Sequence, residues 1–372
     1  MRSKTMNILF TCAGRRNYLL HYFRDALSGS GRVLAADSNK NAAAMIEADA
    51  AFLVPRVESP DYIPTLLTLC EQQKVGMLIA LNDNELFILS EAKHRFRRIG
   101  TQVVVSSPGV IALAADKLAT ADFATELGIA TPASYLHVDT ALKAVEQGEL
   151  CFPLFVKPRW GSASLGVECV NDIDELRWAW QLGLRRLPRN SLQPYAARED
   201  GLLIQNALRG QEYGIDVVND LEGRYQTTFV KRKLGMRSGE TDQAVTENCP
   251  ELVALGRRLG EALKHVGNLD CDVFMGAGKP CLLELNPRFG GGYPFSAAAG
   301  ADVPSALIAW AKGKAPPLHW DAIRHNVMSS KCERIVSINR SATPVSEETP
   351  SVKSPYETTA NNFATTPMAL FR

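Results

Sequence analysis

Five short apolar runs alternate with helical stretches along the first 115 residues, and this alternation constrains the fold more than any other feature of the chain. Such runs are typical of strands buried on both faces, with helices between them that cover a parallel sheet. We therefore predict an α/β, Rossmann-like domain over residues 1–115, with ligands at the carboxyl ends of its strands. The five runs are NILFTCAG (7–14), RVLAAD (32–37), AAFLVP (50–55), VGMLIAL (75–81) and TQVVVSS (101–107).

The strand ends carry charged residues but lack a dinucleotide fingerprint. Gly14 stands alone before Arg15 and Arg16, so the glycine pattern of a nicotinamide-binding loop is missing, although Asp37 lies about where a ribose-binding acid would. Two interpretations of the arginines stay open. They are solvated residues at a helix start, or they bind an anionic ligand there, because cations at that end oppose the helix dipole.

Length and composition set wider limits. A chain of 372 residues exceeds what one core usually serves, so we expect two or three domains that share a cleft. A C-terminal extension over 316–372 should end in a flexible tail rich in Ser, Thr and Pro. The net charge of +1 and the lack of a long apolar stretch predict neither nucleic acid nor a membrane as partner. Eight scattered cysteines, without a CxxC, indicate buried reduced thiols and a cytoplasmic protein.

A lysine at a strand end precedes a loop of small residues. In VKPRWGSASLGV, Lys157 ends an apolar run, and the loop GSASLG (161–166) follows before the next strand. Such a loop can fold over a triphosphate and offer backbone N–H groups while the lysine meets phosphate oxygens. The Walker A order is absent and small-residue hairpins are common, so this stretch alone does not identify a site.

A second motif supplies oxygen ligands. In LLELNPRFGGGYP, Glu284 and Asn286 are two apart on a strand and face the same way, and the partner strand of a probable hairpin carries Asp270 and Asp272. Such a set suits Mg²⁺, and the arginine four residues after Glu284 can reach a phosphoryl group. The alternative is the solvent face of an amphipathic hairpin, although Asn-Pro-Arg followed by three glycines is poor strand sequence.

Together these stretches resemble the ATP-grasp superfamily, and in particular single-module proteins similar to half of a carbamoyl-phosphate synthase large subunit. The resemblance covers roughly residues 7–310. It implies an α/β pre-ATP-grasp domain over 1–115, followed by a two-subdomain, α+β ATP-grasp fold over 116–315 with a lid subdomain at about 150–205. Six stretches carry it in the family's order: FTCAGRRNYLLHYFRDAL, ADKLATADFATELGIATPASY, FVKPRWGSASLGV, LIQNALRGQEYGIDVV, GMRSGET and LLELNPRFGGGYPFSAAAG.

The resemblance also implies a role for each matching residue. The expected ligands of the nucleotide are Lys117, Lys157, Gly161, Ser162, Ala163, Ser164, Gly166, Gln205, Asn206, Ala207 and Glu212. The expected ligands of Mg²⁺, or of Mn²⁺, are Asp272 or Asp270 with Glu284 and Asn286. The expected catalytic residues are Arg288, Lys157 and Arg237. Asn206 departs from the family, in which glutamate is frequent, and this puts the adenine contacts in doubt.

The implied activity is the ATP-dependent joining of a carboxylate to an amine or a thiol. ATP converts the carboxylate into an acyl phosphate, whose leaving group is phosphate rather than oxide, and the protein supplies alignment and charge. Two alternatives stay open: formation of carbamoyl phosphate or carboxyphosphate, and nucleotide binding without turnover in a regulatory protein. Small-molecule carboxylates and amines are the expected partners, and pairing into a homodimer is a further expectation.

The second substrate should enter beside the N-terminal domain. One strand end offers arginines for a carboxylate and another offers acidic residues for an ammonium, so an amino-acid-like substrate is expected. The alternative is that both groups stabilise the domain interface. The residues expected to line this pocket are Arg15, Arg16, Asn82, Asp83, Glu85, Arg237, Gly291 and Gly292.

Overall fold

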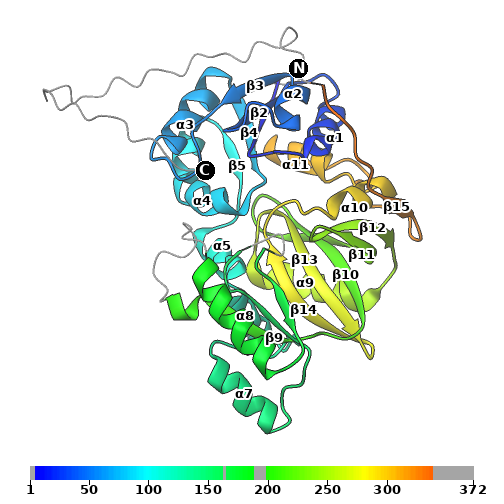
Figure 1. The fold of residues 1–372 in the computed structure, drawn as a ribbon. Helices are drawn as coiled ribbons and strands as arrows, with labels where there is room; N and C mark the ends of the chain where they lie inside the picture. The colour runs from blue at the N-terminus through cyan, green and yellow to red at the C-terminus, as the bar shows by residue number, and fades with distance from the viewer. Residues whose placement is uncertain (1–4, 162–164, 188–197, 338–372) are drawn as a thin grey trace, which may run out of the picture.

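The computed structural model describes residues 5–161, 165–187 and 198–337. A parallel sheet forms the N-terminal domain and two antiparallel sheets form the rest, so the chain combines α/β and α+β architecture as predicted (Figure 1). Within the described ranges, no helix is both long enough and apolar enough to cross a membrane.

The N-terminal domain alternates strands and helices, and its five strands match the five predicted runs. Its elements are β1 Asn7–Thr11, α1 Asn17–Leu27, β2 Val33–Asp37, α2 Ala43–Glu47, β3 Ala50–Leu53, α3 Tyr62–Gln72, β4 Val75–Ala80, α4 Asp83–Arg98, β5 Gln102–Val104 and α5 Pro108–Ala115. The strands pair in parallel in the order β3-β2-β1-β4-β5. Phe10 of β1 packs with α1 and its neighbour Leu9 packs with α3 and α4, so helices cover both faces.

A small antiparallel sheet in the order β6-β9-β7-β8 forms the lid subdomain. The elements of this part are α6 Lys117–Glu126, β6 Ser134–Tyr135, α7 Val138–Glu146, β7 Leu154–Pro158, β8 Glu168–Val170, α8 Ile173–Arg186, a 3₁₀ turn Arg198–Gly201 and β9 Leu202–Asn206. β6 lies before the range predicted as the lid and joins this sheet by pairing with β9. Ala141 and Ala144 of α7 also pack into the lid core.

The largest sheet is antiparallel, in the order β14-β13-β10-β11-β12-β15. Its strands and the adjoining helices are β10 Gln211–Asn219, β11 Tyr225–Arg237, β12 Glu240–Thr246, α9 Pro250–Leu263, β13 Gly267–Gly276, β14 Lys279–Asn286, α10 Tyr293–Ala299, α11 Val303–Ala311 and β15 Met328–Ser330. The predicted hairpin is confirmed as β13–β14. Ile215, Val217 and Val230 pack one face of the sheet against α9. Because successive side chains of a strand point to opposite faces, the residues between these three point to the other face of the sheet.

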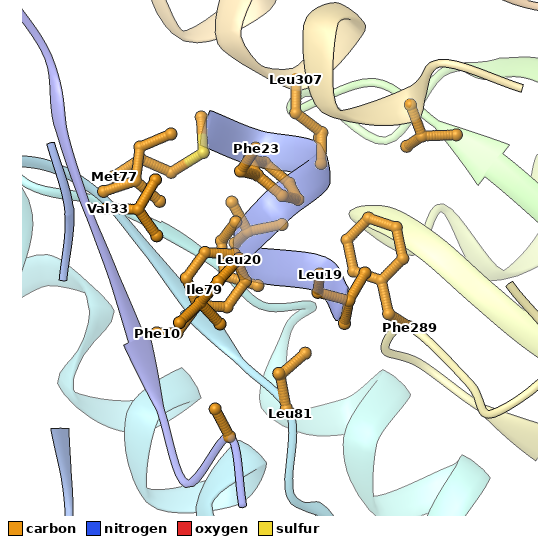
Figure 2. Close-up of a cluster of buried hydrophobic side chains, with 14 of the residues drawn as sticks. Phe10, Leu19, Leu20, Phe23, Val33, Met77, Ile79, Leu81, Phe289 and Leu307 are labelled. Carbon is orange, nitrogen blue, oxygen red and sulfur yellow. The ribbon is translucent and has the colours of Figure 1, made fainter. Parts of the chain in front are cut away.

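One hydrophobic core joins the N-terminal domain to the late helices (Figure 2). Phe23 of α1 meets Phe289 edge to face, with ring centroids 6.0 Å apart, and Leu307 of α11 lies in the same cluster. Burial of each such side chain stabilises the fold by about 1.5–3 kcal/mol. This core therefore contains residues from both sides of the predicted boundary at residue 115, because α11 packs on α1.

The chain after α11 returns along the largest sheet. β15 extends that sheet by pairing with β12, and Trp320 packs edge to face against Trp310 and Phe229. We call residues 326–337 the C-terminal strap. The first part of the predicted C-terminal extension thus has a fixed place in the fold, whereas the predicted tail falls mostly in residues 338–372, outside the described ranges.

The eight cysteines are all free thiols, as predicted, but they are not all buried. Cys70 and Cys271 lie in the core, whereas Cys151, Cys169 and Cys332 are exposed. The expectation of buried thiols is wrong for these three, and for Cys169 the reason is that β8 is an edge strand with one face open to solvent.

Stability should depend on the protonation of His265, which is fully buried beside the carbonyl of Val217. Burial lowers the pKa of His265 from 6.5 to about 4. As the pH falls from 6.5 to 4, the unfolded chain takes up a proton that the native protein does not, so this residue should reduce the free energy of unfolding by about 3 kcal/mol.

Urea unfolding of the wild type and of His265→Gln at a series of pH values checks this prediction. The variant should lose the part of the pH dependence that lies between 4 and 6.5. An unchanged slope in the variant would show that other groups cause it.

Candidate active site

The charged face of the largest sheet places a lysine between two carboxylates. Lys233 of β11 donates to Oε1 of Glu212 and to Oδ1 of Asp272, both at 2.6 Å. Burial acts to lower the pKa of Lys233, but Asp272 and Glu212 outweigh burial and raise it above its usual value. Lys233 is therefore a permanent cation that holds the predicted ribose acid and a predicted metal ligand together.

Two further lysines reach the same hairpin from α6 and β7. Nζ of Lys117 donates to the carbonyl of Gly161 at 2.6 Å and lies 3.3 Å from Oε1 of Glu284. Lys157 is buried, and burial together with the charge of Lys117 lowers its pKa to about 8, although Glu284 and Asp272 act in the opposite direction. The structure thus brings together the two predicted phosphate-binding lysines, and a bound anion would relieve their mutual repulsion.

The predicted metal ligands face each other across the β13–β14 hairpin. Asp272 pairs with Glu284, and Asp270 pairs with Asn286, in the strand register. Oxygen donors of this kind fit Mg²⁺, which takes its remaining ligands from phosphate and water. Among the described residues, no three acidic, His or Cys side chains already converge as a complete metal site. Lysines hold two of these carboxylates, so a metal would have to compete with them.

Arg288 is held by the N-terminal domain. Its guanidinium donates to both carboxylate oxygens of Asp83, at 2.6 and 2.7 Å, and to Oδ1 of Asn286 at 3.2 Å. Burial acts to lower the pKa of Arg288, but Asp83 outweighs it and the pKa is raised. The charge of Asp83 is thus matched by a bidentate ion pair across the domain interface, and its contact with a substrate ammonium stays a prediction.

Asn82 and Glu85 start a helix rather than line a pocket. Oδ1 of Asn82 accepts from the backbone N–H of Asn84, and Oε1 of Glu85 accepts from the N–H groups of Leu81 and Asn82. Glu85 is fully buried and also accepts from the hydroxyl of Tyr62 at 2.6 Å. Together they form a capping box, which the Asn-x-x-Glu spacing already allows, and their role as substrate ligands stays a prediction.

Arg16 spans the same domain interface. Its Nη1 donates to the carbonyl of Leu81 at 2.7 Å and to the carbonyl of Phe289 at 3.2 Å. One guanidinium therefore joins the end of β4 to the segment that follows β14, which favours the interface interpretation for this residue. Arg15 is exposed beside it.

Arg237 lies at the end of β11, away from the lysines. It forms an ion pair of 2.9 Å with Glu333 of the strap, and both side chains are more than half exposed. The β11–β12 hairpin carries Arg237 to the surface, where it fastens the strap, and its catalytic role stays a prediction.

The residues predicted around adenine lie on β9 and use their side chains locally. Nε2 of Gln205 donates to Oγ of Ser134 at 2.6 Å, and Oδ1 of Asn206 accepts from the N–H of Ala133 at 2.7 Å. Asn206 therefore ties the segment before β6 to β9. The other predicted loop and hinge residues are Ala207, which donates to the carbonyl of Pro153, Gly166, which has a positive φ, and Ser162, Ala163 and Ser164, which lie outside the described ranges.

The glycine run after β14 gives room to charged side chains. A Cβ on Gly290 would lie 2.1 Å from Cγ of Asp270, and a Cβ on Gly292 would lie 2.7 Å from Cε of Lys231. Burial, followed by the charge of Asp272, raises the pKa of Asp270 to about 7. The turn can therefore pass directly over this charged face only because these positions have no side chain.

Sequence analysis missed a buried layer beneath that turn. Lys231 donates to Oδ2 of Asp216 at 2.6 Å, and Ser296 of α10 donates to the same oxygen at 2.5 Å. All three side chains are fully buried. The available signal was FVKRK on β11, where two lysines at alternate positions must face the same side of a strand.

A cavity of about 570 Å³ lies between α5, α8 and β14. It reaches the charged cluster at Glu284 and Asn286, whereas most of its lining is apolar and includes Ile111 and Leu182. The converging charges mark the candidate site better than this cavity does, because phosphoryl transfer depends on placed cations rather than on apolar space.

Two family models match the chain. Residues 8–104 match the PylC-like, N-terminal domain, and residues 198–333 match the model described as ATP-grasp in the biosynthetic pathway with Ter operon. The second match contains the whole charged face of the largest sheet. This family model identifies residues 198–333 as ATP-grasp. This confirms the resemblance at the level of the superfamily, and the finer likeness to half of a carbamoyl-phosphate synthase large subunit stays a prediction.

A curated relative, the D-alanine–D-alanine ligase of Streptococcus pyogenes serotype M49, is 31% identical over 202 residues. That match covers 52% of this ATP-grasp chain and 56% of the relative. The chain therefore spans about half the length of the curated relatives it matches.

Solved structures show the same fold. The biotin carboxylase domain dimer of Hydrogenobacter thermophilus 2-oxoglutarate carboxylase, in complex with MgADP and bicarbonate, has a TM-score of 0.66 at 14% identity and covers 88% of this chain and 74% of its own. The L-amino acid ligase of Bacillus licheniformis has a TM-score of 0.60 at 16% identity. The match covers 82% of this chain and 74% of the ligase. The predicted ATP-grasp architecture is confirmed.

Replacing Gly290 by alanine should damage the site. Its Cβ would overlap the carboxylate of Asp270, which is confined by the sheet, and we expect a loss of about 1–3 kcal/mol in the free energy of unfolding. Thermal unfolding measures the effect. Gly291→Ala is the matched control, because the nearest atoms there are 3.2 Å away at the flexible ends of side chains. Equal stability of the two variants would contradict the overlap.

Proposed function

We propose that this ATP-grasp protein is a ligase that joins a carboxylate to an amine, or to a thiol, through an acyl phosphate formed with ATP. The observation that carries the proposal is the meeting of Lys117 and Lys157 with Asp272 and Glu284 on the β13–β14 hairpin. Cations of this kind suit the phosphates of ATP, and the paired carboxylates suit the metal that accompanies them.

The reaction has two steps that balance. A carboxylate oxygen of the first substrate attacks the γ-phosphorus of ATP, and the bond between that phosphorus and ADP breaks. The amine nitrogen then attacks the acyl carbon, phosphate leaves, and the nitrogen loses a proton. Alignment of the reacting groups supplies about 7–11 kcal/mol, and each placed cation supplies about 3 kcal/mol.

Lys117 and Lys157 would hold the phosphates in this scheme. Lys157 is buried at the end of β7, and its pKa of about 8 means that the side chain is only partly protonated near pH 8. A bound anion would favour the protonated form. Lys117 also donates to the carbonyl of Gly161, so its position is coupled to the first residue of the lid loop. Lys117 would therefore both bind phosphate and hold Gly161 in place.

The hairpin would hold the metal through Asp272, Glu284 and Asn286. Bound there, Mg²⁺ neutralises charge on the phosphates, and Mn²⁺ accepts the same oxygen ligands. Lys233 keeps its second partner, Glu212, when Asp272 turns to a metal, so no buried charge is left without a counter-ion.

Arg288 would stabilise the transferred phosphoryl group. Asp83 fixes its guanidinium through Nε and Nη2, and Nη1 donates to the carbonyl of Phe289 at 3.3 Å. Because Nη2 also donates to Asn286, four of the five guanidinium N–H groups have partners, and one N–H of Nη1 is left to contact a phosphate oxygen. Asp83 is thus a positioning residue for Arg288.

ADP release in the presence of Mg²⁺ and ATP, screened over pooled carboxylates and amines with mass analysis of the product, tests the proposed function. Glu284→Gln should lower turnover at least 100-fold, whereas Glu261→Gln, which removes an exposed carboxylate near Arg257, should not. ADP release that depends on bicarbonate and no other carboxylate would favour carboxyphosphate chemistry. ATP binding without ADP release from any pool would favour a regulatory protein.

The affinity for Mg·ATP should fall at high pH because of Lys157. Its pKa is about 8 in the free protein, and a bound phosphate favours the charged form and raises that pKa. Binding above pH 8 therefore requires proton uptake, and the affinity should drop about fivefold between pH 8 and pH 9. Calorimetry in buffers of different ionisation enthalpy measures both effects. Lys157→Arg keeps its charge over this range, so a similar pH dependence in that variant would contradict the assignment.

A further inference from the structure

The proposed reaction leaves one large cavity without a role. This cavity of about 570 Å³ lies between α5, α8 and β14, below the N-terminal domain in Figure 1. Its lining includes Asp83, Glu284 and Asn286. Arg288 donates to both Asp83 and Asn286, so the cavity reaches the two residues that hold the proposed phosphoryl arginine. One end of the cavity therefore adjoins the proposed site of phosphoryl transfer.

The other walls of the cavity are mostly apolar and come from separate parts of the fold. Ile111 lies on α5, Leu182 on α8 and Leu285 on β14. Leu182 is 42% exposed, and Leu165, which also lines the cavity, is 76% exposed. Contact of these side chains with water costs free energy that an apolar ligand would recover. The cavity is therefore open to solvent and suited to an apolar occupant.

Trp160 gives the cavity a fixed aromatic wall. The guanidinium of Arg159 lies over the Trp160 ring, 4.4 Å from its centroid, and donates to both carboxylate oxygens of Asp116 at 2.7 Å. Asp116 also pairs with Trp160 in a β-bridge and caps α6 by accepting from the N–H groups of Leu118 and Ala119. The junction of α5 and α6 thus holds Trp160 in place, so this wall is formed before a ligand binds.

The size and the charges of the cavity define what fits it. A benzene ring fills a cavity of about 150 Å³, so one of about 570 Å³ accommodates a body larger than a single aromatic ring. Arg288 matches Asp83, and Lys117 lies 3.3 Å from Glu284. The other charged residues of the described lining are Glu168 and Arg186, which are exposed. A charge on the body of a ligand would therefore meet no buried counter-ion there, and its burial would be costly.

We propose that this cavity binds the apolar body of the carboxylate substrate, which is an alkyl or aryl carboxylic acid without a second charge. This inference rests on the proposed function. The carboxylate lies at the end formed by Glu284 and Asn286, and the hydrocarbon lies between Trp160, Ile111 and Leu182. The acid is assigned here rather than the amine because its acyl phosphate is open to hydrolysis. Apolar walls keep water away from the acyl carbon until the amine attacks.

A series of acids of increasing length tests the inference. Calorimetry uses the whole protein with Mg²⁺ and a non-hydrolysable ATP analogue, and it compares acetate, butyrate, hexanoate, octanoate and 3-phenylpropionate. The affinity should rise about threefold to fourfold for each added methylene, because burial of one methylene stabilises binding by about 0.8 kcal/mol. 3-Phenylpropylamine has the same body with an ammonium instead of a carboxylate, and it should bind at least tenfold more weakly than 3-phenylpropionate.

Variants that change the walls locate the binding. Ala179 lines the cavity from α8, so Ala179→Phe fills part of it and should weaken the binding of octanoate and 3-phenylpropionate at least tenfold. Leu182→Asn removes an apolar wall at a half-exposed position and should weaken both at least threefold. Ala112→Phe is the matched control, because Ala112 is an exposed residue of α5 outside the lining, and it should bind as the wild type does. The affinity for the ATP analogue should be unchanged in all three variants, which also shows that they fold.

The outcomes distinguish this inference from the proposed function. An affinity that does not rise with chain length, or equal binding by Ala179→Phe and Ala112→Phe, would overturn the inference. ADP release with short polar acids alone would also overturn it and yet support the ligase. Equal binding of 3-phenylpropylamine would contradict the assignment of the cavity to the acid. Length-dependent binding that Ala179→Phe abolishes, without ADP release from any acid and amine, would support the cavity as the binding site and count against the ligase.

Discussion

The balance of buried lysines and carboxylates on one face of the six-stranded sheet is the constraint on which the rest of the site depends. Lys231 and Lys233 both lie on β11, and each is matched within 2.6 Å by a carboxylate of a neighbouring strand. An unmatched charge at either position would cost several kcal/mol, so the set forms as a unit or not at all. The opposite face of the same strands is apolar and rests on α9, which fixes the spacing of the charges.

The junction between domains places the remaining groups. Phe23, Phe289 and Leu307 share one core, so the N-terminal domain and the segment after β14 cannot separate without exposing apolar surface. Within that junction Asp83 holds Arg288, and Arg16 binds carbonyls from both sides. The arginine expected at the phosphoryl group is therefore positioned by a domain that supplies none of the phosphate-binding lysines.

Several predictions from sequence were correct because they rest on local rules. The five apolar runs formed a parallel sheet, and the β13–β14 hairpin appeared where alternation and a glycine turn indicated it. Lys157 and Glu284 met because each belongs to a stretch of recognisable pattern. Three predicted ligands have protein partners in the structure: Glu85, Asp83 and Arg237 are charged residues near strand ends, and a charge at such a position serves a helix cap or an ion pair as readily as a ligand.

The sequence by itself determined the order of elements, the apolar and polar faces of each strand, and the motifs of an ATP-grasp protein, because all of these follow from periodicity and short-range spacing. Only the tertiary structure decided which charges are matched. Glu240 and Lys331 are 91 residues apart, and Asp83 and Arg288 are 205 apart. Neither pair has a local signal, since the first depends on the return of the strap to β12 and the second on the packing of two domains. A charge becomes a ligand, a clamp or a cap according to the partner that packing brings within about 3 Å of it.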